Sequence, residues 1–354
     1  MSTYQKIISG LLIVLGAIFV GVYFFTSSDV PAESEMHGDV VGQVQEKNEE
    51  RTDDVPSGTI ASHRTVHITD GVKHTVPLRD IRSGGPGKDG IPPIDNPKFE
   101  SAAKAGEWLR EDSAGIAVSI DGVHRFYPFS ILVWHEIVND SINGQRILVT
   151  YCPLCLSGIV FDPVVQGERV EFGTSGKLWN SNLIMYDRKT DTYWSQVLGE
   201  AIRGELAGQT LSVLPSDQIR FKEFKANFPQ GEVLTRKTGA FRDYDRDPYG
   251  DYYTDDRAVF FPVDNVDSRL DAKDFVLGIV VDGKAKAYYP PAVQAAGEIE
   301  DTYAGKTIVA RYEHELEAVR LYEKLPDGTL ERINPFASFW FSWVAVHPDT
   351  ELYK

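Results

Sequence analysis

The chain has 354 residues, of which 42% are hydrophobic and 25% charged, with 30 Gly, 19 Pro and only 2 Cys. Its 18 Phe, 16 Tyr and 6 Trp supply enough apolar surface for a core, which excludes wholesale disorder. Two cysteines exclude a disulfide-dense scaffold. Acidic residues outnumber basic ones by 52 to 36, so this surface would repel a phosphate backbone, which argues against nucleic acid as a partner.

The N-terminus carries an apolar run, Ile7 to Phe25, that contains no charged residue. At about 1.5 Å of rise per residue, a helix of this length crosses the hydrocarbon core of a bilayer. Lys6 precedes the run and the first charge after it is Asp29, so the positive end is expected to stay inside the cell. We predict a signal-anchor transmembrane helix within residues 1–25, which contacts the lipid bilayer through residues 7–25. The protein is then a single-pass protein of the cell membrane whose C-terminal part is extracytoplasmic.

The next two segments differ from the rest of the chain in composition. Residues 26–76 begin with a polar, acidic stretch that cannot bury enough apolar area to offset the entropy of ordering, and this predicts a disordered acidic stalk. Residues 77–114 begin with a stretch rich in Gly and Pro, which predicts an extended arm on the domain surface.

A repeated pattern organises the remainder. The segments 115–151 and 278–312 share an Asp-Gly turn, Asp121-Gly122 in the first and Asp282-Gly283 in the second, and several apolar and polar positions in the same order. Each segment is predicted to form two strands joined by the Asp-Gly hairpin, a short helix, and further strands around a Gly-containing turn. The sequence therefore predicts a strand-rich α+β fold made of two related halves from an internal duplication. The first repeat covers residues 115–240, and an acidic loop with a second, degenerate repeat covers residues 241–354.

The first half contains a set of residues suited to metal or redox chemistry. Cys152 and Cys155 directly follow a predicted strand, and two thiols three positions apart can chelate one soft ion or close a small disulfide. A predicted helix over 129–138 carries His135 one element away, and Met185 offers a weak thioether. A set of two cysteines and one histidine suits copper before zinc. We expect a metal site formed by Cys152, Cys155 and His135, serving metal handling or redox chemistry.

Two alternatives stay open. The same thiols serve a metal-free thiol–disulfide oxidoreductase, although residues 156–161 read as a turn and a strand, whereas thioredoxin needs a helix beginning at the first cysteine. The second alternative is a non-catalytic binding module with a structural disulfide, whose partner is an unidentified small molecule or cell-envelope component. For His135, the alternative is a hydrogen bond to backbone or to a neighbouring carboxylate.

Small polar residues downstream provide candidate catalytic side chains. Ser175 and Gln196 lie among Gly, Asn and Trp residues that favour a pocket wall, while turns and hairpin caps use the same residue types. The sequence does not decide whether the chain is an enzyme. Farther on, three alternating aspartates from Asp243 resemble a calcium loop, but Pro248 and Thr254 occupy positions where an EF-hand needs Gly and Glu. We expect an acidic, tyrosine-rich surface loop there.

An ordered series of short motifs carries a family resemblance. The series is WHEIVND, YCPLC, SG, SNL, YDR, WSQ and RDPYGDY. It resembles a prokaryotic family, often secreted or membrane-anchored, that is known as a domain of unknown function. The resemblance covers about Gly115 to Ala287. It implies no reaction and assigns no catalytic residue.

Overall fold

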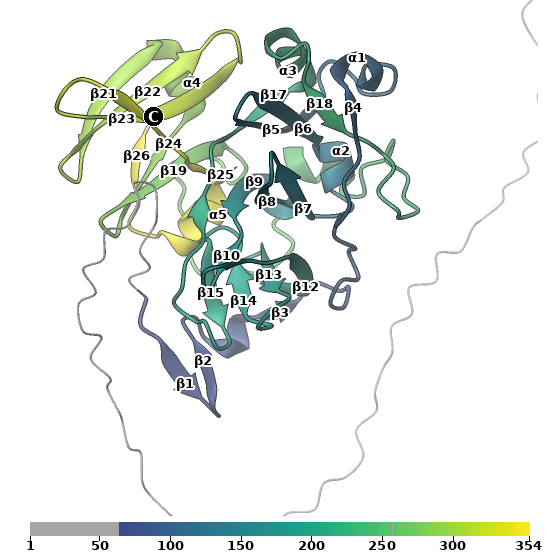
Figure 1. Ribbon diagram of the computed structural model, residues 1–354. Helices are drawn as coiled ribbons and strands as arrows, with labels where there is room; N and C mark the ends of the chain where they lie inside the picture. Colours follow the sequence, from purple (N-terminus) through teal and green to yellow (C-terminus); the bar gives the residue numbers. More distant parts are fainter. Residues whose placement is uncertain (1–63, 257) are drawn as a thin grey trace, which may run out of the picture. The chain divides into compact units, whose positions relative to one another are not determined.

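The computed structural model describes residues 64–256 and 258–354. This part of the chain is strand-rich, with short helices at strand ends, in agreement with the expected α+β class (Figure 1). The predicted anchor, residues 1–25, and residues 26–63 of the predicted stalk lie outside the described residues. Residues 64–76, which were also expected to be disordered, instead contain the paired strands β1 (His67–Thr69) and β2 (Val72–His74). Within residues 64–256 and 258–354, no helix has the length and apolar character needed to cross a membrane.

The first half is built on two sheets joined by the chain running from one to the other. In the five-stranded sheet, β6 pairs antiparallel with β5 and parallel with β18, and β17 and β4 form the edges. In the four-stranded sheet, β8 is central and pairs with β7 and β9. The strands of the first sheet are β17 (Ser216–Arg220), β5 (Ala114–Ile120), β6 (Val123–Pro128), β18 (Glu232–Leu234) and β4 (Phe99–Ser101). Those of the second are β16 (Ser212–Val213), β9 (Ser157–Asp162), β8 (Gln145–Cys152) and β7 (Ile137–Ile142).

The second half repeats this order of pairing. Strand β20 pairs antiparallel with β19 and parallel with β26, β25 lies beyond β19, and β22 is central in a second antiparallel sheet. One sheet contains β25 (Phe336–Phe339), β19 (Phe275–Val281), β20 (Lys284–Tyr288) and β26 (Glu351–Tyr353). The other contains β21 (Glu298–Tyr303), β22 (Lys306–Glu313), β23 (Ala318–Lys324) and β24 (Leu330–Ile333).

Local contacts match between the halves as well. Both Asp-Gly turns have positive φ at both residues, 49° and 78° at Asp121-Gly122 and 48° and 75° at Asp282-Gly283, as the predicted hairpins require. A tyrosine hydroxyl donates to an aspartate in each half, from Tyr127 to Asp140 and from Tyr288 to Asp301. The two halves thus use the same pairing, turns and internal hydrogen bonds.

The helices are short and occupy strand ends. The predicted helix over 129–138 is shorter in the structure: α2 ends at Leu132, and β7 begins at Ile137. Ile137 and Val138 are β-branched residues whose stiff side chains favour the ladder with β8 over continued helix. The α-helices are α1 (Ala102–Ala105), α2 (Phe129–Leu132), α3 (Phe221–Asn227), α4 (Pro290–Ala296) and α5 (Trp340–Val346), and the 3-10 helices are η1 (Leu78–Asp80), η2 (Pro153–Cys155) and η3 (Gly250–Thr254).

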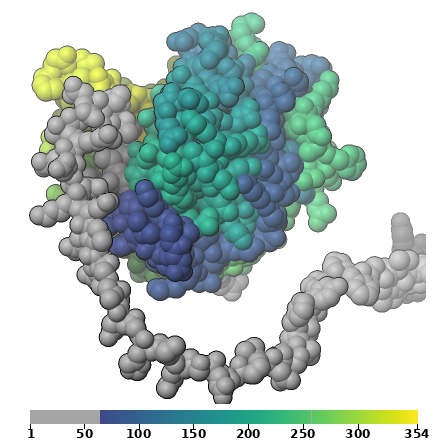
Figure 2. All heavy atoms as spheres, turned by 60° about the horizontal axis from the view of Figure 1, so that its bottom comes forward, coloured from purple at the N-terminus to yellow at the C-terminus, as the bar shows by residue number. Residues whose placement is uncertain are grey.

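A further sheet belongs to the first half alone. Its central hairpin, β12–β13, is followed by β14 and β15, and the segment that precedes the first half supplies edge strands on both sides. Figure 2 shows this segment, in purple and blue, lying against the teal part of the chain, which contains the other strands of the sheet. The strands are β1 (His67–Thr69), β2 (Val72–His74), β15 (Glu200–Arg203), β14 (Tyr193–Ser195), β13 (Asn182–Asp187), β12 (Phe172–Trp179) and β3 (Arg82–Ser83), and a separate ribbon pairs β10 (Val164–Val165) with β11 (Glu168–Arg169).

The main hydrophobic core lies where these parts meet. It contains Cys152 and Cys155 from the first half, Met185 and Trp194 from the seven-stranded sheet, and aromatic side chains of α5 from the second half. The thiol pair is therefore surrounded by both halves and by the added sheet.

Candidate functional site

The two cysteines lie at either end of a tight turn. Strand β8 ends at Cys152, η2 turns the chain, and Leu156, at φ 49°, directs it back into β9, so that Cys152 pairs with Ser157. This confirms the predicted turn and strand after the thiols. Both cysteines are free and buried, with exposed fractions of 1% for Cys152 and 0% for Cys155. The two thiols are neighbours, because both face the carbonyl oxygen of Ser181 and each acts on the ionisation of the other.

Groups from distant parts of the chain surround the sulfurs. The carbonyl oxygen of Ser181, at the tip of the β12–β13 hairpin, lies 3.3 Å from the Cys155 sulfur and 4.0 Å from that of Cys152. The amide of Asn182 and the hydroxyl of Ser342 on α5 lie beside Cys155. The site thus combines the first half, its added sheet and the second half.

These surroundings make the two thiols unequal. Burial raises the pKa of Cys152, and hydrogen bonding to Cys155 together with the charges of Cys155 and Glu136 raises it further. Burial would also raise the pKa of Cys155, but the polar side chains of Cys152, Ser342 and Asn182 beside it hold that pKa below the ordinary thiol value. Cys155 is therefore the sulfur that more readily becomes a thiolate, and Cys152 is the one that keeps its proton.

His135 does not join the two thiols. Its Nδ1 lies 2.7 Å from the carbonyl oxygen of Pro92, and its Nε2 lies 2.7 Å from the hydroxyl of Tyr244. Burial lowers the pKa of the ring, which is 1% exposed. Because both ring nitrogens already have partners, His135 is not placed as a ligand alongside Cys152 and Cys155, and the predicted set of two cysteines and one histidine does not come together. Met185 is buried on β13, where it pairs with Thr174 and Trp194.

The residue after His135 approaches the thiols instead. Glu136 is 8% exposed, and its carbonyl oxygen accepts a hydrogen bond from Tyr151 N at 2.7 Å, which places it opposite the end of β8. Its charge acts on both cysteines. Burial raises the pKa of Glu136 to about 8. Glu136 is not among the site residues predicted from the sequence; the signal for it is a charged residue next to His135, in a segment that forms a turn rather than the expected helix.

The tyrosine-rich loop is part of the site rather than a simple surface loop. Tyr249, Tyr252 and Tyr253 pack on the core that contains the cysteines, and the hydroxyl of Tyr252 donates to the carbonyl oxygen of Leu154 at 2.8 Å. Burial raises the pKa of Tyr249, as do the charges of Glu136 and both thiols. Tyr249 also lines an open groove of about 490 Å³, so this one ring adjoins both the groove and the buried site.

Gln196, a candidate catalytic residue, lies in a closed network of buried polar groups beneath the cysteine turn. Its Oε1 accepts from Ser157 at 2.7 Å and from Asn182 at 2.9 Å, and its Nε2 donates to Thr150 at 3.1 Å. Asn182 in turn accepts from Val197 N at 3.0 Å. These bonds fix the strands on which the turn and the hairpin tip are held, so the side chain acts as structural support.

Replacing Gln196 with alanine is expected to lower the unfolding free energy by about 2–4 kcal/mol, because it leaves a buried cavity and removes hydrogen-bond partners from Ser157, Thr150 and Asn182. Chemical denaturation would measure this loss. Replacement of the half-buried Gln218, whose amide donates to Gly158 O at 3.3 Å, is the matched control and is expected to cost less. Equal costs for the two variants would show that the network does not support the site.

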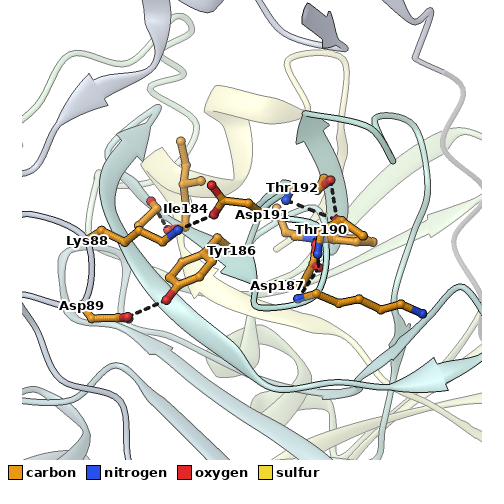
Figure 3. Close-up of polar contacts among 11 residues, drawn as sticks. Lys88, Asp89, Ile184, Tyr186, Asp187, Thr190, Asp191 and Thr192 are labelled. Atoms are coloured by element: carbon orange, nitrogen blue, oxygen red, sulfur yellow. Dashed lines mark hydrogen bonds and ion pairs between the residues drawn. The ribbon is translucent and has the colours of Figure 1, made fainter.

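Ser175, the other candidate, lies in the bulge of β12 where the pairing with β13 shifts register. Its hydroxyl donates to the carbonyl oxygen of Ile184 and accepts from Lys177 N, so the hydroxyl is both donor and acceptor in hydrogen bonds within the sheet. Figure 3 shows the neighbouring contacts of β13 with the predicted arm, where the Tyr186 hydroxyl points to Asp89. Ser175 thus belongs to the bulge that receives the arm and is not brought to the thiols.

Other motif residues also have structural partners. Asp187 is fully buried and accepts from Trp194 Nε1 at 2.9 Å and from Thr190 Oγ1 at 2.9 Å, which closes the turn between β13 and β14 (Figure 3). In the described parts of the chain, no group of three or more His, Cys, Asp or Glu side chains is arranged to hold a metal ion. What the structure does assemble is a buried thiol pair, an adjacent carboxyl group and a cover of tyrosines.

No curated protein and no solved structure matches the chain. The model of one family, described as a protein of unknown function (DUF3179), matches residues 88–350, which is more than the span of the motifs. The chain therefore belongs to the DUF3179 family of proteins of unknown function.

Proposed function

We propose that Cys152 and Cys155 form a dithiol–disulfide redox couple and that the protein is a thiol–disulfide oxidoreductase. The observation that carries this proposal is the closeness of the two buried sulfurs, which lie 4.0 Å (Cys152) and 3.3 Å (Cys155) from one carbonyl oxygen, that of Ser181, with the pKa of Cys155 lowered and that of Cys152 raised. In a pair of this kind, one sulfur attacks the substrate disulfide and the second sulfur then resolves the mixed disulfide. Such a pair needs no third ligand.

The exchange proceeds in two balanced steps. The Cys155 thiolate attacks one sulfur of a disulfide RSSR, which forms a Cys155–SR mixed disulfide and releases one RS⁻, which takes up a proton. The Cys152 thiol then loses its proton and attacks the Cys155 sulfur, which closes the Cys152–Cys155 bond and releases the second RSH. Two protein thiols are oxidised and one disulfide is reduced to two thiols.

Burial of the sulfurs favours a small partner. Neither cysteine is more than 1% exposed, so a disulfide on a folded protein surface does not reach them without displacing the tyrosine cover. The groove that Tyr249 lines is the entry that we propose for a small disulfide. We therefore propose a low-molecular-weight disulfide, with the corresponding thiol as product.

Equilibration of the full chain in dithiothreitol redox buffers tests the proposal, with the oxidised fraction read from the mass added by a thiol-alkylating reagent. A reversible two-electron transition is expected, and it should be lost in Cys152→Ser and in Cys155→Ser. His135→Ala is the control that should keep the transition. A disulfide that never reduces in these buffers supports the binding module instead, and thiols that never pair exclude the couple.

A copper(I) centre made by the two thiolates alone is the second candidate. Both sulfurs face the same carbonyl oxygen, that of Ser181. This convergence of the two sulfurs favours binding of one ion by both. Thiolates are ligands that copper(I) prefers over harder donors. Stoichiometric copper that is lost in both cysteine variants and kept in His135→Ala would establish this centre, and loss in His135→Ala would restore the ligand set expected from the sequence.

Two wider proposals complete this function. The matched pairing order and hydrogen bonds of the halves support an internal duplication, in which Glu313 and Leu316 stand at the positions of Cys152 and Cys155, so that the first half alone carries the chemistry. The apolar run 7–25 supports a membrane anchor with the domain outside the cytoplasm. A C-terminal reporter enzyme that is active only outside the cytoplasm would test the second, and an inactive reporter would reject it.

A further inference from the structure

Glu136 occupies a turn whose counterpart in the second half is a glycine. Glu136 N donates to Leu132 O at 2.7 Å, and its carbonyl oxygen accepts from Tyr151 N at 2.7 Å. In the second half, Gly297 N donates to Val293 O at 2.8 Å, and its carbonyl oxygen accepts from Tyr312 N at 2.8 Å. Glu136 and Tyr151 are separated by the same number of residues as Gly297 and Tyr312. The two backbone positions are therefore equivalent.

The backbone at this position suits glycine. Glu136 has φ 59° and Gly297 has φ 78°, and the hydrogen bond from Ile137 N to His135 O at 2.6 Å closes a three-residue turn around Glu136. This form of γ-turn is rare and strained for a residue with a side chain, whereas glycine adopts it freely. The fold therefore does not require a glutamate here, and the first half bears a conformational cost that the second half avoids.

In the described part of the chain, no hydrogen bond or ion pair of the side chain offsets this cost. The Glu136 carboxyl group is 8% exposed, and among residues 64–256 and 258–354 it has neither a hydrogen-bond nor an ion-pair partner. The titratable groups that face it are the thiols of Cys152 and Cys155 and the phenol of Tyr249, and Asp247, Tyr252 and Tyr253 adjoin those groups. An unpartnered buried carboxyl in a strained turn is typical of a residue kept for chemistry.

We infer that Glu136 is the proton-transfer group of the thiol pair, donating to the Cys152 sulfur when the disulfide is reduced and taking the proton back when it forms. This inference rests on the proposed redox couple. In reduction, a small thiolate RS⁻ attacks the Cys155 sulfur, the Cys152–Cys155 bond breaks, and the Cys152 sulfur leaves with the proton of Glu136. A second RS⁻ attacks the RS sulfur of the mixed disulfide, which releases RSSR and the Cys155 thiolate.

The need for this proton follows from the thiol surroundings. Cys152 is a poor leaving thiolate because burial and its neighbours raise its pKa. A carboxyl that stays protonated near neutral pH, as burial makes Glu136, can supply the proton where bulk water is excluded. At alkaline pH the carboxyl becomes charged and this supply ends.

The test is the rate at which 2-mercaptoethanol reduces the oxidised full chain, measured from pH 6 to 10 in wild type, Glu136→Gln and Glu136→Gly. Both variants are expected to lower the rate at pH 7 by about 10²-fold, the usual size of general acid catalysis. In wild type the rate should stop rising near pH 8, whereas in the variants it should follow thiolate concentration throughout. Glu136→Gly should keep or raise the thermal unfolding midpoint, since glycine suits the turn.

Glu223→Gln is the matched control, because Glu223, on α3, is also buried but pairs with Arg220 at the end of β17. It should leave the rate and its pH profile unchanged. Wild-type rates and profiles in both Glu136 variants would overturn the inference while the redox couple stands. A strong loss of stability in Glu136→Gly together with a wild-type profile in Glu136→Gln would assign Glu136 a structural role. Absence of any reversible oxidation in wild type would refute the redox couple itself.

Discussion

Replacing Trp343 with alanine is expected to lower the unfolding free energy by about 3–5 kcal/mol, the usual cost of removing a fully buried aromatic ring. Trp343 is 0% exposed, and its Nε1 donates to the Thr350 hydroxyl at 2.9 Å. The ring lies so close to Gly278 that a Cβ added there would be 2.3 Å from it. Gly278 has no side chain that could fill the space left by the ring.

The same substitution should also make the two thiols more accessible to reagents. Trp343 follows Ser342, which lies beside Cys155, and both belong to α5. Loss of the ring should loosen α5 and increase the rate at which a small alkylating reagent modifies the cysteines. Denaturant unfolding and timed alkylation would measure the two effects. Val266→Ala, at a side chain that is 86% exposed, is the control and should change stability by less than about 0.5 kcal/mol. A similarly small change in Trp343→Ala would show that α5 does not hold the site together.

The second large effect is a pH dependence of stability caused by Glu136. Burial raises the pKa of Glu136 to about 8, above its ordinary value of 4.5, so the folded protein keeps a proton that the unfolded chain loses between these pH values. The unfolding free energy should therefore fall as pH rises from about 5 to about 8, by up to about 1.4 kcal/mol per pH unit from this group. Above the folded pKa the contribution becomes constant.

The stability difference between wild type and Glu136→Gln isolates this contribution, because other titrating groups are common to both proteins. Glutamine is neutral at every pH, so the unfolding free energy of the variant relative to wild type should increase steadily as pH rises across this range. Denaturant unfolding at half-unit pH steps would measure the difference. A difference that stays flat with pH would mean that the carboxyl is solvated in the folded protein, and it would remove the physical basis for a proton kept beside Cys152.

Several local features follow from the sequence. The Asp-Gly pairs predict hairpins because positive φ at both turn positions is tolerated there, and both hairpins form with that geometry. The strand after Cys155 was likewise predicted, since β-branched and aromatic residues follow a short turn. The helix over 129–138 was predicted too long, because apolar spacing alone does not reveal that Ile137 and Val138 pair with β8.

The sequence by itself determined the Asp-Gly hairpins and the turn and strand that follow the two thiols, because these depend on residues close together in the chain. Only the tertiary structure decided which groups surround the thiols. In the folded protein, the His135 ring forms hydrogen bonds with Pro92 and Tyr244, because a buried imidazole needs partners for both ring nitrogens. The tertiary structure brought Glu136, Ser181 and Ser342 to the sulfurs from three separate segments, since packing between both halves and the added sheet fixes contacts that no local pattern encodes.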